Sequence, residues 1–288
     1  MSSSVWRSSA LTAACFVAAC TGAVGRGPQA EPGDDGAGGA PPIGGRGAAG
    51  GSGGASAACN LGSAPLRRLS RFEYDNAVRD LLGDDSAPAR GFPAEVGGNG
   101  FGNDANALDT SRVLVEQYFN AAQTLADELT RDVSKLRTLV GCDPASGEER
   151  CAADFIARFG LRAYRRPVAA DERDRLLALY RLERADGDVA GGMAAVIATM
   201  LQAPQFLYRI ESTAPGQRLS SYELASRLSF LLWGSVPDES LLRVAASGGL
   251  DDASAVAREA RRLLDDPRAR AVTEQFHRVH FRLVGLEG

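Results

Sequence analysis

The feature that most constrains the fold is an apolar stretch at residues 193–201, MAAVIATML. It lies between a Gly-Gly pair and the Gln-Ala-Pro segment that ends at Pro204. A helix drawn through this stretch has no charged face, and a helix that is apolar all round must be buried. The stretch is too short to cross a bilayer, which takes about 20 apolar residues. We therefore predict a central buried helix with amphipathic segments packed against it.

Residues 1–20 have the pattern of a bacterial export signal. Arg7 precedes a short apolar core at residues 10–18, and Val-Ala-Ala-Cys closes the segment at Cys20. A short apolar run that ends in small residues is typical of a cleaved signal rather than a membrane span. The last four residues resemble a lipobox, in which the cysteine is lipidated. The alternative is an ordinary signal peptide cut near Ala19; we favour a lipid anchor at Cys20, which places the protein at the cell envelope.

Residues 21–58 consist mainly of Gly, Ala, Pro and Ser. Such a segment cannot bury a core, and we expect a disordered tether. The remaining 230 or so residues are enough for one large domain or two small ones. The net charge of −4 argues against a nucleic-acid partner, because proteins of that class are usually basic.

Three cysteines follow the predicted signal segment. In an oxidising envelope, Cys142 and Cys151 are positioned to close a small loop through a disulfide. A metal site is the alternative, but the spacing is not CxxC and no histidine is nearby in the sequence, so we favour the disulfide. Cys59 is then the odd cysteine, either free or paired outside this chain.

The rest of the sequence shows helix signals. Ser70 with Glu73 and Ser220 with Glu223 each form the capping-box pattern that starts a helix, and Gly83 ends the first one. A second helix carries an apolar stripe at spacings of three and four, made by Leu114, Tyr118, Ala122, Leu125 and Leu129. We expect a third helix to end near Arg166, because Pro167 follows.

Further helices are expected around residues 176–180, 238–242, 252–264 and 269–283, and residues 206–210 form a helical turn or a strand. No segment shows the alternation that is typical of a half-buried strand. The sequence therefore predicts an all-α, multi-helix body.

Three pairs of motifs resemble domains of unknown function. LRRLSRFEYDNAVRDLLG at 66–83 with GFGNDAN at 100–106 resembles domain fifteen-eighty-seven. FGLRAYRRPV at 159–168 with QAPQFLYRIE at 202–211 resembles fifteen-ninety-five, and LSSYELASRLSFLLWGSVPD at 219–238 with DPRAR at 266–270 resembles fifteen-ninety-two. We accordingly divide the body into segments 59–140, 141–213 and 214–288.

The resemblance implies a large exported protein of the planctomycete and myxobacterial type, often found near cytochrome c-like modules. It carries no established catalytic residues, so none is assigned. The chain has no CxxCH motif, so we expect no covalent haem on it. The resemblance also implies further C-terminal domains, so we expect that the printed chain is a truncated gene product.

The two histidines of the chain, His277 and His280, lie one helical turn apart, with Glu274 three residues earlier. This is a usable spacing for metal ligands. The alternative is two polar residues on a surface helix, which we favour because short motifs are weak evidence.

A Gly- and Asn-rich loop offers oxygen donors of the kind that calcium prefers, namely Asn103, Asp104, Asn106 and Asp109. The loop lacks the EF-hand order of ligands and its closing glutamate, and these residue types also suit an ordinary loop. Calcium or ligand binding here is our first hypothesis for a functional loop.

Four arginines, Arg158, Arg162, Arg165 and Arg166, gather near the end of the third helix. They suit either an anion site or the electrostatics of a helix C-terminus, and we favour the second. The sequence as a whole indicates a binding or scaffolding protein without its own catalytic centre. The alternative is a domain or subunit of an exported redox enzyme that works with cytochrome c-like modules on polymeric carbohydrate.

Overall fold

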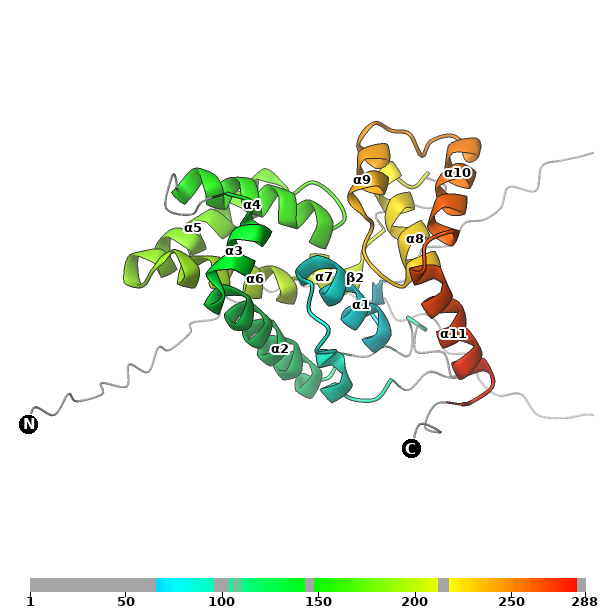
Figure 1. Cartoon of the computed structure of the whole chain (residues 1–288), viewed down its shortest axis with the longest axis horizontal. Helices are drawn as coiled ribbons and strands as arrows, with labels where there is room; N and C mark the ends of the chain where they lie inside the picture. The colour runs from blue at the N-terminus through cyan, green and yellow to red at the C-terminus, as the bar shows by residue number, and fades with distance from the viewer. Residues whose placement is uncertain are drawn as a thin grey trace, which may run out of the picture. The chain divides into compact units, whose positions relative to one another are not determined.

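The computed structural model describes residues 66–95, 104–105, 108, 110–142, 148–211 and 218–283. The chain divides into two units, residues 1–57 and 58–288, and every described residue belongs to the second. The predicted signal segment, Cys20, the tether and Cys59 lie outside the described residues. Within the described part the protein is all-α, as the sequence predicts (Figure 1).

Eleven α-helices, one 3-10 helix and two short strands make up the described part. In chain order they are β1 (Arg67–Arg68), α1 (Arg71–Leu82), η1 (Pro88–Gly91), α2 (Arg112–Arg131), α3 (Val133–Val140), α4 (Glu148–Ala163), α5 (Ala170–Asp186), α6 (Val189–Gln202), α7 (Pro204–Leu207), β2 (Tyr208–Arg209), α8 (Ser221–Trp233), α9 (Glu239–Ala246), α10 (Ala253–Leu264) and α11 (Arg268–His280).

The start and end of α1 follow from its sequence signals. The hydroxyl of Ser70 accepts from the Glu73 N–H at 3.2 Å, and the Glu73 carboxylate accepts from the Ser70 N–H at 2.8 Å. At the other end Gly83 adopts φ +70°, a left-handed conformation that glycine reaches without steric cost, and donates to the Arg79 carbonyl. The predicted capping box at Ser220 is present in the same form at the start of α8.

Helix α6 holds the apolar stretch at the centre of the larger hydrophobic cluster, and it packs against α2, α4 and α5 (Figure 1). Its side chains Met193, Ile197 and Leu201 are fully buried. Each such side chain contributes about 1.5–3 kcal/mol by leaving water. The burial is not complete all round, because Thr199 is exposed. Gly192 allows α5 to approach, since a Cβ there would lie 2.8 Å from the Tyr180 ring.

The larger cluster joins helices on both sides of the predicted segment boundary at 140/141. Four aromatic rings near α1 belong to it, with centroids 5.0–5.8 Å apart. They are Tyr74, Phe92, Tyr118 and Phe206. Side chains from the first two predicted segments therefore belong to one hydrophobic core.

The smaller cluster is built around Trp233 at the end of α8, with α9, α10 and the start of α11. The indole N–H of Trp233 donates to the Leu263 carbonyl at 2.8 Å, which satisfies this buried polar group. Phe230 and Val236, from α8 and the turn after it, belong instead to the larger cluster. Helix α8 thus contributes side chains to both cores.

Several expectations about individual elements were only partly right. Helix α3 was not predicted; Asp132 caps it by accepting from the N–H groups of Ser134 and Lys135. Helix α4 ends at Ala163, three residues earlier than expected. Residues 204–209 form both alternatives in turn, a helical turn and then a strand.

The predicted disulfide between Cys142 and Cys151 is confirmed, with the two Cα atoms 6.1 Å apart. It ties the end of α3 to the first turns of α4. Gly141 ends α3 with φ +69°, and the Arg158 guanidinium donates to the last carbonyls of α3, those of Leu139 and Val140. A covalent link and a charged cap thus hold these two helices together.

Candidate functional site

A short antiparallel pairing brings the start of α1 against the segment that follows α6. In this pairing Arg67 lies opposite Arg209 and Arg68 opposite Tyr208. The Leu69 N–H then donates to the Leu207 carbonyl at 2.8 Å. The pairing places two arginines side by side next to the N-terminus of α1.

Beside these arginines is a cleft of about 420 Å³, lined by residues from β1, the N-terminal part of α1, β2, α8 and α11. This volume is within the usual range for small-molecule sites, about 300–1,000 Å³. One wall is apolar, and its side chains are Phe230, Leu231, Val272, Phe276 and Val279. The cleft is therefore amphipathic, since the arginines and two carboxylates also line it.

The charged part of the cleft is largely buried. Glu73 and Arg209 form an ion pair at 3.4 Å, with side chains 9% and 11% exposed. The Arg209 guanidinium also lies over the Phe230 ring, 4.9 Å from its centre. Burial lowers the pKa of Arg209 below its ordinary value. The nearby charge of Glu73 opposes this effect, and the charge of Arg67 adds to it.

Glu95 is the second carboxylate of the cleft. Its Oε1 atom accepts from the Arg71 N–H at 2.5 Å, which fixes the side chain against the first turn of α1. Burial raises the pKa of Glu95, and the backbone N–H of Arg71 and the charge of Arg68 only partly oppose this effect. Glu95 therefore holds a proton more readily than an exposed glutamate.

The four arginines near the end of α4 make structural contacts among the described residues, in line with the interpretation that the sequence favours. Arg158 caps α3, and Arg162 donates to the Asp80 carbonyl at 2.5 Å. Arg166 forms a two-pronged ion pair with Glu172 at 2.8 and 2.9 Å.

Arg165 is buried and has φ +60°. It donates to four carbonyls, those of Ala163, Gln205, Phe206 and Tyr208. Its guanidinium also lies 5.6 Å from the centre of the Phe230 ring, on which Arg209 stacks as well. Burial, with the neighbouring charge of Arg209, lowers the pKa of Arg165 to about 9, so the side chain is cationic at neutral pH.

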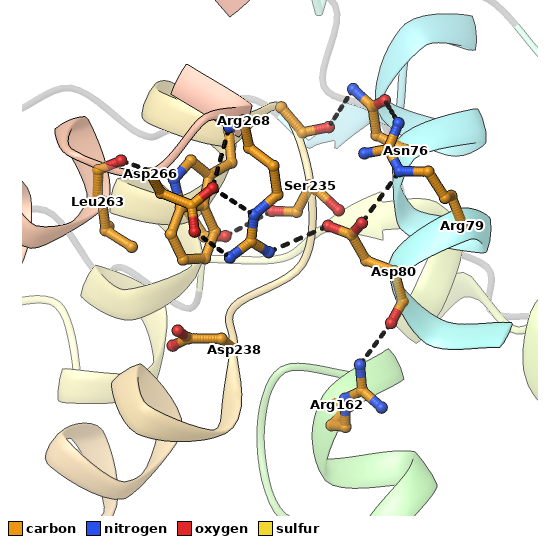
Figure 2. A network of polar contacts seen from close by, with 12 residues as sticks. Asn76, Arg79, Asp80, Arg162, Ser235, Asp238, Leu263, Asp266 and Arg268 are labelled. Carbon is orange, nitrogen blue, oxygen red and sulfur yellow. Dashed lines mark hydrogen bonds and ion pairs between the residues drawn. The ribbon is translucent and has the colours of Figure 1, made fainter. Parts of the chain in front are cut away.

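A second polar cluster surrounds Arg268 at the start of α11 (Figure 2). This guanidinium donates to Asp266 at 2.8 Å and to Asp80 of α1 at 3.3 Å. Nearby, the Asn76 amide donates to the Gly234 carbonyl at 3.4 Å. These contacts join α1 to the α8–α11 part of the chain, and we assign them a structural role.

The predicted metal ligands lie on α11 and are exposed. Glu274 is paired with Arg270 at 2.7 Å, while His280 stacks on Phe276 and His277 on Phe281. The described part of the chain has no group of three or more His, Cys, Asp or Glu side chains that could hold a metal ion. The histidine site stays a prediction.

Of the predicted calcium loop, only Asp104 is described; Asn103, Asn106 and Asp109 lie outside the described residues. The described residues on either side of the loop are close to the cleft. Glu95 lines it, and the Thr110 hydroxyl is 2.7 Å from that of Tyr208 in β2. The calcium hypothesis is not tested.

Sequence reasoning missed the cleft. Arg67 and Arg209 are 142 positions apart, and each lies in a two-residue strand that has no alternating pattern. The one available signal was that Arg67 and Arg209 each fall within a motif of the family resemblance.

Among the described residues, no helix has the length and apolarity needed to cross a membrane.

The described residues define an all-α protein with a charged, half-apolar cleft, and three family models identify its parts. The model for protein of unknown function DUF1587 matches residues 67–131, that for DUF1595 matches 151–211, and that for DUF1592 matches 219–287. The chain therefore contains all three of the domains that its motifs resemble. No curated protein and no solved structure matches it.

Proposed function

We propose that this chain is a binding and scaffolding protein of the bacterial cell envelope, and that its ligand site is the cleft between α1, β2, α8 and α11. The observation that carries the proposal is the burial of the Glu73–Arg209 ion pair beside an exposed apolar wall. Placing charges in such a site is costly and is a poor way to stabilise a fold. A buried pair that lines an open cleft is instead typical of a binding site.

A binding role is also supported by how the carboxylates of the cleft are used. Glu73 accepts hydrogen bonds from the Ser70 N–H and from Arg209, and Glu95 accepts from the Arg71 N–H. These hydrogen bonds fix both carboxylates at the N-terminus of α1. The second candidate, a part of an exported redox enzyme acting beside cytochrome c-like modules, rests on the company that the resembled domains keep.

The location is part of the proposal and is supported by the sequence alone. The apolar core at residues 10–18 and the lipobox pattern before Cys20 favour a lipid anchor. We expect Cys20→Ala to move the protein from the membrane fraction to the soluble fraction of its native host. Unchanged membrane association would contradict the anchor.

The binding function is tested by filling the cleft. Thr273 lines the cleft on α11 and is exposed, so Thr273→Trp adds bulk there without opening the core. Ala271 is exposed on the same helix and does not line the cleft, so Ala271→Trp is the matched control. Each variant is extracted gently from native membranes, and the bound molecules and partners are identified by mass spectrometry.

We expect Thr273→Trp alone to lose a co-purifying molecule or partner. Identical profiles for both variants and the wild type would overturn the binding proposal. A haem absorption band or stoichiometric metal in the extracts would favour the redox alternative.

A further inference from the structure

Two arginines in the cleft have unused hydrogen-bond donors. The Arg209 side chain is 11% exposed, and the one hydrogen bond that it donates to a described residue is long, 3.4 Å to Glu73. A guanidinium has five N–H donors, so most of those of Arg209 are left for the cleft. Arg67, which lies opposite it across the β1–β2 pairing, is half-buried and has no hydrogen-bond or ion-pair partner among the described residues.

The immediate surroundings of these arginines are cationic, although the chain as a whole is acidic. The guanidinium of Arg165 also lies over the Phe230 ring, 5.6 Å from its centre, and is buried. The two carboxylates of the cleft are already engaged, Glu73 with Arg209 and Glu95 with the Arg71 N–H. Arginine donors that are left unpaired in a partly dry site favour an oxyanion, because charge-assisted hydrogen bonds are the strong ones.

The other wall of the cleft is apolar and suits an apolar part of a ligand. Leu231 is 68% exposed and Phe276 is 50% exposed, and they lie with Val272 and Val279 along the same wall. Exposed apolar side chains that line a concave site gain by being covered, at roughly 25 cal/mol per Å² of apolar surface removed from water. The cleft therefore offers an oxyanion site and an apolar surface side by side.

We propose that this cleft binds a single-chain anionic amphiphile, with a carboxylate between Arg67 and Arg209 and an apolar chain along the α8–α11 wall. The inference rests on the proposed function, since it names the class of ligand for the same cleft. A cationic amphiphile is disfavoured because its head group would meet the two arginines.

The probe is decanoate, titrated into the full chain by isothermal calorimetry at a concentration where it does not form micelles. Decyltrimethylammonium, with a chain of the same length and the opposite charge, is the matched ligand. We expect decanoate to bind and the cation to bind at least tenfold more weakly, because only the carboxylate accepts charge-assisted hydrogen bonds from the arginines.

The matched variants are Arg67→Gln and Arg112→Gln. The Arg67 side chain makes no hydrogen bond or ion pair with a described residue, and Arg112 is an exposed arginine of α2 that does not line the cleft. Arg67→Gln should weaken decanoate binding about tenfold, and Arg112→Gln should leave it unchanged. Leu231→Ser should also weaken it several-fold, with circular dichroism confirming that each variant is folded.

The outcomes separate the ligand class from the function. Equal affinity for the two amphiphiles, or decanoate binding that survives Arg67→Gln, overturns the anionic ligand. If the cation binds and Thr273→Trp abolishes its binding, the cleft is still a binding site and only the ligand class is wrong. If neither amphiphile binds and Thr273→Trp changes no co-purifying molecule, both proposals fail together.

Discussion

The guanidinium of Arg268 lies over the indole ring of Trp233, 3.4 Å from the ring centre. The same guanidinium donates to Asp80, 188 positions earlier in the chain, and to Asp266. One side chain therefore connects α11, the end of α8 and the first helix (Figure 2). This connection stabilises one side of the region in which the cleft is formed.

We expect Arg268→Ala to lower the free energy of unfolding by about 1–3 kcal/mol, because it removes a cation–π contact and charge-assisted hydrogen bonds. Urea unfolding followed by the fluorescence of Trp233 measures the loss. The other tryptophan of the chain, Trp6, lies in the predicted cleaved signal, so in the processed protein the fluorescence has one source. Arg270→Ala is the control: its ion pair with Glu274 has side chains 83% and 52% exposed, so the effect should be close to zero. An equal loss in both variants would contradict the role of Arg268.

Replacing Arg165 should destabilise the protein more than replacing Arg268. Arg165→Ala leaves four carbonyls without their donor, and we expect a loss of about 3 kcal/mol or more. Arg173→Ala, which breaks an exposed pair with Asp174, should cost less than about 1 kcal/mol. Thermal unfolding by circular dichroism compares them, and similar melting temperatures would show that Arg165 has no special role.

The sequence predicted the helices where their signals are local. Capping boxes at Ser70 and Ser220, the glycine at position 83 and the stripe that begins at Leu114 all depend on residues within four positions of each other. Helix α3, which begins after Asp132, was not predicted. Asp132 is itself a standard N-cap residue, so that signal was available.

The cleft was beyond sequence reasoning for a physical reason. It depends on β1 pairing with β2 and on α11 lying against α8, and both contacts are between residues far apart in the chain. The arginines near the end of α4 fit the structural interpretation that their position in the sequence favoured, because the four side chains point to different carbonyls and carboxylates.

The disulfide between Cys142 and Cys151 predicts that these cysteines do not react with alkylating reagents. Cys151 is 5% exposed and bonded to Cys142, so neither should be alkylated by iodoacetamide in the native, oxidised protein. Replacing both by serine should lower the free energy of unfolding by about 2–3 kcal/mol, the value expected for closing a loop of this length. Mass spectrometry of the alkylated peptides, with and without dithiothreitol, tests the bond. Alkylation of Cys142 without reductant would contradict it.

The carboxyl of Glu95 predicts a specific pH dependence of stability. Burial raises its pKa in the folded state above the ordinary 4.5, and the charge of Glu73 adds to this effect. The backbone N–H of Arg71 and the charges of Arg68 and Arg71 oppose it without cancelling it. The folded state thus binds more protons than the unfolded state between the two pKa values. Stability from this group is present at low pH and falls as the pH rises through that window.

Glu95→Gln removes this titration and keeps an oxygen that accepts from the Arg71 N–H. We expect the variant to gain stability relative to the wild type as the pH rises above about 4.5, and to stay ahead by a constant amount at neutral pH. Urea unfolding at a series of pH values measures the difference. Glu116→Gln, at an exposed position on α2, should give a curve parallel to the wild type. A Glu95→Gln curve parallel to the wild type would show that the carboxyl does not gain protons on folding.

Glu95→Gln should also strengthen decanoate binding at neutral pH, because it removes a negative charge from the cleft that Arg67 and Arg209 line.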